Sequence, residues 1–70
     1  MTYLNAMRMA LEAMDMAREY VQDAIYEYEA LSHHKPERLR AMKMDLQFIE
    51  NSMFHLVDTI SHEAAKESEK

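Results

Sequence analysis

The chain contains no glycine and a single proline in 70 residues. Tight turns between strands and loops that cradle phosphates both need glycine, for positive φ angles or for close backbone approach. Folds built on such turns and loops are therefore excluded, and an all-α fold is predicted. The chain also lacks cysteine, which removes disulfides, thiol chemistry and cysteine-ligated zinc.

The single proline, Pro36, follows the polar segment 32–35 and marks the one break in the chain. Proline disfavours a helical residue before it but is well tolerated in the first turn of a helix, where Glu37 also places a carboxylate. We therefore predict one domain over 1–70. It has a helix over about 3–32, a turn at 33–35, a helix over about 36–66 and a polar tail at 67–70.

Apolar residues recur at alternating intervals of three and four in both segments, the pattern of a helix that packs along one seam. In the second segment they are Leu39, Met42, Leu46, Ile49, Met53, Leu56 and Ile60. In the first they are Tyr3, Met7, Ala10, Met14, Ala17, Val21, Ala24, Tyr28 and Leu31, flanked by Leu4, Leu11 and Ile25. Alanine alternates with larger residues there, which favours a close approach of two helices.

Folding the chain back at the histidines brings the two seams together in one antiparallel register. The numbers of facing residues then sum to 67, in the pairs Tyr28 with Leu39, Ile25 with Met42, Val21 with Leu46, Met14 with Met53, Leu11 with Leu56 and Met7 with Ile60. A single register satisfies all of these pairs, so we predict an antiparallel helical hairpin.

One charged residue enters this seam, because Arg18 falls opposite Ile49. We expect the methylene groups of Arg18 to pack in the seam while its guanidinium reaches the edge and meets Glu50. A role in fixing the register is the alternative.

A second apolar surface lies outside the seam. Over the first 21 residues the apolar arc spans roughly 240°, which is wider than one neighbouring helix can cover. The extra residues fall on one side of the hairpin, where Tyr20 and Phe48 are expected to meet, while the other side is expected to be polar. The second apolar surface, a partner or dimer interface, comprises Met9, Ala13, Met16, Tyr20, Ala41, Met44 and Phe48. We expect a second copy to cover it in a four-helix bundle, and a different protein is the alternative.

The charge balance is acidic, with 8 basic and 13 acidic residues and a net charge of −5. One basic stretch at the predicted hairpin tip interrupts it. This stretch is short and close to an acidic segment, so nucleic-acid binding is the alternative function and not the leading one. Its contact residues would be Lys35, Arg38, Arg40 and Lys43.

Groups that could carry chemistry are sparse. His55, Asp58 and His62 share one helical face, but we interpret them as a solvated face and expect no metal site, no cofactor and no enzyme activity. Carboxylates lie on polar faces and no serine has a plausible triad. No run of about 18 apolar residues occurs and the first 20 residues are charged, so a cytoplasmic location is expected.

Two resemblances concern larger parts of the chain. The layers formed by Ala10, Met14, Ala17, Val21 and Ala24 resemble the architecture of the Rop-like RNA-binding hairpins, but the corresponding surface here carries Glu12, Asp15, Glu19 and Asp23. In size and acidity the chain from Met1 onward also resembles the small helical accessory proteins of lambdoid phage early regions. This second resemblance implies a non-enzymatic regulator or adaptor that acts by protein contact.

Overall fold

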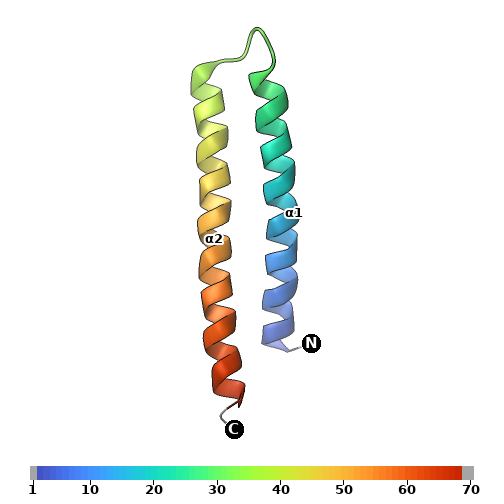
Figure 1. Ribbon diagram of the computed structural model, residues 1–70, viewed down its shortest axis with the longest axis vertical. Coiled ribbons are helices and arrows are strands. Elements are labelled where there is room, and N and C mark those ends of the chain that lie inside the picture. The colour runs from blue at the N-terminus through green and yellow to red at the C-terminus, as the bar shows by residue number, and fades with distance from the viewer. Residues whose placement is uncertain (1, 69–70) are drawn as a thin grey trace.

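The computed structural model describes residues 2–68, which form two helices, α1 (Tyr3–Glu29) and α2 (Pro36–Ser68). The helices lie side by side and antiparallel, joined by one turn, so that α1 begins and α2 ends at the same end of the molecule (Figure 1). The hairpin is a rod of 58 × 17 × 12 Å. The all-α class and the antiparallel hairpin are confirmed.

Helix α1 begins after a side-chain cap and ends three residues before the predicted boundary at 32. The Thr2 hydroxyl accepts a hydrogen bond from the Asn5 amide at 3.2 Å, which satisfies one of the free amides of the first turn. At the other end the helical pattern stops at Glu29, and the Leu31 amide donates to the Tyr28 carbonyl three residues back. The chain thus tightens into the turn where the sequence pattern had suggested one more helical turn.

The turn is held by Tyr28 and His34. The Tyr28 hydroxyl accepts a hydrogen bond from the Lys35 amide at 3.0 Å, and the Tyr28 and His34 rings meet edge to face at 6.1 Å. The Nδ1 atom of His34 lies 2.8 Å from the Leu31 carbonyl oxygen. A carbonyl only accepts, so Nδ1–H is the donor, and His34 is half-buried.

Helix α2 starts at Pro36 as predicted, and runs to Ser68, two residues beyond the predicted end. Glu37 lies in its first turn and Lys66 in its last, so charges of the favourable sign face both ends of the helix dipole. The first two residues of the predicted tail, 67–68, are helical, and 69–70 lie outside the described residues.

The half-buried positions of the two helices agree with the predicted pairs, and on α1 they leave out Ala10 and Ala24 of the predicted three-four pattern. The members of the α1 seam are half-buried or buried, at strict intervals of three and four: Leu4, Met7, Leu11, Met14, Arg18, Val21, Ile25 and Tyr28. The number of each of these residues and that of a half-buried residue of α2 sum to 67, from the pair Tyr28 and Leu39 at the tip to the pair Leu4 and Glu63 at the open end. The residues expected to flank the seam therefore lie in it.

The alanines of the predicted α1 seam lie beside it instead. Ala10 and Ala24 are exposed, Ala17 is half-buried, and Tyr3 and Leu31 are exposed as well. Rotating α1 toward its leucines and isoleucine buries larger side chains against α2, and the apolar area removed from water grows accordingly. The alanines are left for another surface.

The hairpin buries little. Ile25, 9 % exposed, is the single buried hydrophobic residue among residues 2–68. The chain exposes 5752 Å², whereas a compact protein of 8.3 kDa exposes about 4,600 Å². In the described part of the chain, neither helix is apolar enough over a sufficient length to cross a membrane.

Candidate protein-interaction surfaces

The second apolar surface is exposed along its whole length. Its large side chains, Met9, Met16, Tyr20, Met44 and Phe48, are between 56 and 73 % exposed. Its two alanines, Ala13 and Ala41, are exposed too. Scattered apolar residues are normal on a protein surface, but a line of large exposed apolar side chains along each of two helices is typical of an interaction site.

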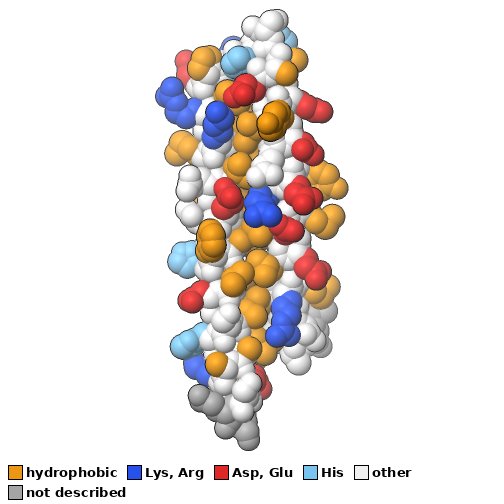
Figure 2. Space-filling view, in the orientation of Figure 1, with side chains coloured by type: hydrophobic (Ala, Val, Ile, Leu, Met, Phe, Trp, Pro, Cys, Tyr) orange, Lys and Arg blue, Asp and Glu red, His pale blue; other side chains and the backbone are white. Residues whose placement is uncertain are grey.

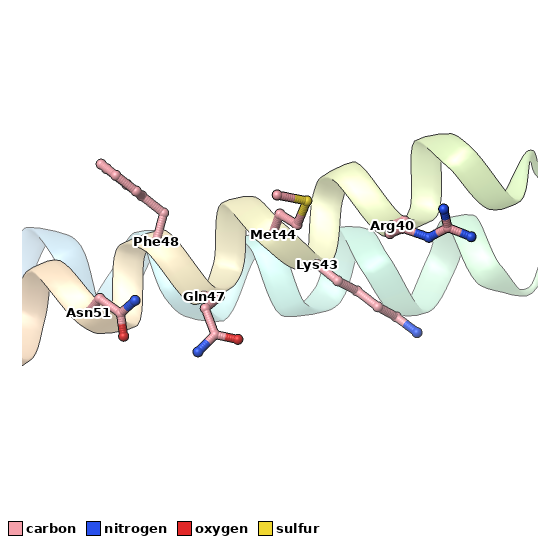
Figure 3. A pocket seen from close by; sticks show the side chains of 6 residues that line it. All are labelled: Arg40, Lys43, Met44, Gln47, Phe48 and Asn51. Atoms are coloured by element: carbon pink, nitrogen blue, oxygen red, sulfur yellow. The ribbon is translucent and has the colours of Figure 1, made fainter.

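On α2 this surface borders an open hollow of about 310 Å³, whose side chains are drawn in Figure 3. Met44 and Phe48 project to one side of the helix, and Lys43 and Gln47 project to the other (Figure 3). The apolar and polar sides of α2 are therefore separated along the outer surface of the hairpin.

The expectation that Tyr20 and Phe48 meet is wrong for a single hairpin. Both rings stay in water, 68 and 73 % exposed, and among residues 2–68 the one aromatic pair is Tyr28 with His34. The positions of Tyr20 and Phe48 relative to the half-buried seam residues place both on one side of the hairpin, each on the flank of its helix that faces away from the other helix.

The opposite side of the hairpin is less polar than predicted. Tyr26, Phe54 and Val57 lie there, and they are 79, 76 and 46 % exposed. Sequence reasoning missed them because they belong to neither the predicted seam nor the second apolar surface. Charged side chains still dominate the face in Figure 2, where they flank a line of hydrophobic side chains that runs between the helices.

Arg18 enters the seam as predicted, but its partner is different. Its guanidinium pairs with Asp15, one helical turn away, at 2.5 Å, and its Nε is buried without a hydrogen-bond partner. Glu50 is half-buried and lines, with Arg18 and Phe54, a hollow of about 140 Å³, yet it forms no ion pair among the described residues. The local i, i+3 pair thus replaces the expected link between the helices.

The basic hairpin tip is exposed and partly neutralised. Lys35, Arg38, Arg40 and Lys43 are all exposed. The Lys43 Nζ lies 3.4 Å from a Glu29 carboxylate oxygen across the hairpin. The acidic end of α1 thus lies against the basic start of α2, which reduces the field available to attract phosphate groups.

The groups considered for metal binding do not converge. His55, Asp58 and His62 are all exposed on α2, and residues 2–68 contain no cluster of three or more His, Asp or Glu side chains placed to hold a metal ion.

A contact at the open end of the hairpin was not anticipated. The Tyr3 hydroxyl shares its one proton between the carboxylates of Glu67, at 3.1 Å, and Glu63, at 3.4 Å, which ties the start of α1 to the end of α2. The hydrogen bond to Glu67, partial desolvation and the charges of both carboxylates raise the pKa of Tyr3 above its ordinary value. The sequence signal was a tyrosine that the register places level with Glu63, since their numbers sum to 66.

Comparisons were made with protein-family models, with curated proteins and with solved structures. No family model, curated protein or solved structure matches the chain significantly.

Proposed function

We propose that this chain is a non-enzymatic regulatory or adaptor protein that acts through protein–protein contacts. Its working form is a dimer of hairpins, a four-helix bundle in which a second copy covers the second apolar surface. The side that carries Tyr26 and Phe54 then remains available to a different protein. The resemblance to phage accessory proteins is in keeping with such a role.

The observation that carries the proposal is the imbalance between buried and exposed apolar side chains. Ten large hydrophobic residues are exposed among residues 2–68, against one that is buried. The chain exposes about 1,200 Å² more than a compact protein of its mass, and each partner of a standard interface buries about 800 Å². The excess is therefore of the size that one copy contributes to a stable interface.

The test compares two phenylalanines of α2 that are alike in exposure and differ in side. Phe48→Glu places a charge in the second apolar surface, where burial in the dimer would cost several kcal/mol per copy. Phe54→Glu makes the same change at a residue that is 76 % exposed on the other side, compared with 73 % for Phe48. Sedimentation equilibrium and circular dichroism are recorded on each variant over a range of concentrations.

The proposal expects Phe48→Glu to be monomeric, with a helicity that falls on dilution, and Phe54→Glu to remain a helical dimer. A Phe48→Glu protein that stays a fully helical dimer would place the interface elsewhere and refute the proposed surface. Affinity capture with wild type and Phe54→Glu then tests the second part of the proposal, because only the wild type should retain the target protein.

A further inference from the structure

The side of α1 that faces neither α2 nor the charged flank is uncharged over most of the helix. Between Tyr3 and Tyr20 it consists of Ala6, Met9, Ala10, Ala13, Met16 and Ala17. We call this the alanine–methionine face. All of its members except the half-buried Ala17 are exposed. The charged residues of the same stretch lie elsewhere: Arg18 lies in the seam with α2, and Arg8, Glu12, Asp15 and Glu19 follow one another at intervals of four, three and four on the other flank.

We propose that the alanine–methionine face packs antiparallel against the same face of a second copy, with the two-fold axis at Ala13. This inference rests on the proposed dimer and gives its topology. In a symmetric antiparallel pair the numbers of facing residues have a constant sum, and an axis at Ala13 makes that sum 26. The facing residues are then Met9 with Ala17, Met16 with Ala10, Tyr20 with Ala6, and Ala13 with itself.

This register places a large side chain over an alanine at each layer away from the axis. Large side chains facing small ones interdigitate without voids, and alanines at the contact let two helix axes approach to about 8 Å. A parallel pair would instead place each residue against its own copy, methionine on methionine and tyrosine on tyrosine. The order of large and small residues on the alanine–methionine face is therefore complementary to itself in an antiparallel pair and not in a parallel one.

Neighbouring registers are excluded by charge and by overlap. A shift of one heptad toward the hairpin tip brings Asp23 opposite Ala10 and Glu27 opposite Ala6, which would desolvate both carboxylates. A shift of one heptad the other way leaves Tyr20 beyond the start of the facing helix. Among registers one heptad apart, the sum of 26 is therefore the one that pairs the stretch from Ala6 to Tyr20 with itself.

The apolar residues of α2 fit this arrangement. Residue i of α1 lies level with residue 67−i of α2, so Phe48 lies level with Glu19, which the proposed register places level with Met7 of the second copy. Beyond Phe48 the same side of α2 becomes polar, at Ser52 and His55.

The test uses single cysteines, which the chain otherwise lacks. Ala13→Cys places two thiols at the axis, where alanine-lined helices bring the Cα atoms within the disulfide range of about 4.4–6.8 Å. Ala6→Cys and Ala24→Cys are matched controls, because both are exposed alanines of the same helix. In the proposed register their two copies lie about 21 Å and about 33 Å apart along the helix axis. Each variant is oxidised at micromolar concentration and its mass is also measured under reducing conditions.

The expected result is a covalent dimer at Ala13→Cys that forms at least about tenfold faster than at either control, because a preformed dimer gives an effective thiol concentration in the millimolar range. Equal crosslinking of all three variants, or crosslinking at a control alone, overturns the topology. If the reduced protein is still a dimer in that case, the proposed function stands and only the topology fails. A wild-type protein that is monomeric contradicts both the proposed function and the topology.

Discussion

Replacing Arg18 by leucine is predicted to stabilise the protein, although it removes an ion pair. Arg18 occupies a seam position opposite Ile49, and its side chain is 34 % exposed. The pair with Asp15 is partly exposed and local, so its loss costs at most about 1 kcal/mol. The buried Nε without a partner costs about 1–3 kcal/mol, and leucine removes that penalty.

The leucine also adds apolar contact in the layer of Ile49, although the methylene groups of Arg18 already supply part of it. The net change expected for Arg18→Leu is a gain of about 1–2 kcal/mol in the free energy of unfolding. Asp15→Asn is the matched control, since it breaks the same ion pair while leaving the arginine in place, and it should destabilise the protein by up to about 1 kcal/mol.

Urea unfolding followed by circular dichroism measures both changes, at one fixed protein concentration because a dimer is stabilised by mass action. A loss of stability in Arg18→Leu as large as in Asp15→Asn would refute the reasoning and would favour a register-fixing role for the arginine. In that event disulfide crosslinks between α1 and α2 in Arg18→Leu should form in more than one register.

Three further predictions concern the register, the open end and the tip of the hairpin. Cysteines introduced together at Met14 and Met53 should form an intramolecular disulfide, whereas the pair Met7 and Met53, one heptad out of step, should not; the reverse pattern contradicts the register. The raised pKa of Tyr3 contributes stability that is complete below about pH 10 and is lost as the pH rises through the folded-state pKa. Tyr3→Phe should remove this loss, so the thermal unfolding midpoint should decline across that window in the wild type but not in the variant. Titration with double-stranded RNA and DNA at low salt should show no binding, and an affinity that falls steeply with the logarithm of salt concentration would instead support the nucleic-acid alternative at the basic tip.

The elements and the register of this fold follow from particular residues of the sequence. Pro36 and the absence of glycine predict two helices and one break, and the spacing of apolar residues on α2 defines its buried side without ambiguity. On α1 the pairing of residues across the hairpin predicts the buried side correctly, whereas the spacing of apolar residues by itself does not. Two apolar stripes lie next to each other there, and spacing alone does not say whether the stripe with Ala10 and Ala24 or the one with Leu11 and Ile25 meets α2. The larger side chains do, because they bury more area.

Features that depend on side-chain conformation could not be read from the sequence. Arg18 had acceptors of the same charge at Asp15 and Glu50, and the choice between them depends on rotamers and not on spacing. The early end of α1 depends on the Tyr28 hydroxyl, which accepts from a turn amide that no helical pattern identifies. For Tyr26 and Phe54, a helical wheel shows the side on which they lie but not that three-quarters of each side chain remains in water.

The most direct test of the central claim is the mass of the wild-type protein, measured together with its helicity over a wide range of concentration. If a second copy covers the second apolar surface, sedimentation equilibrium should give twice the chain mass of 8.3 kDa, and mass and helicity should fall together on dilution. A protein that sediments as a single chain and stays fully helical at every concentration would contradict the account.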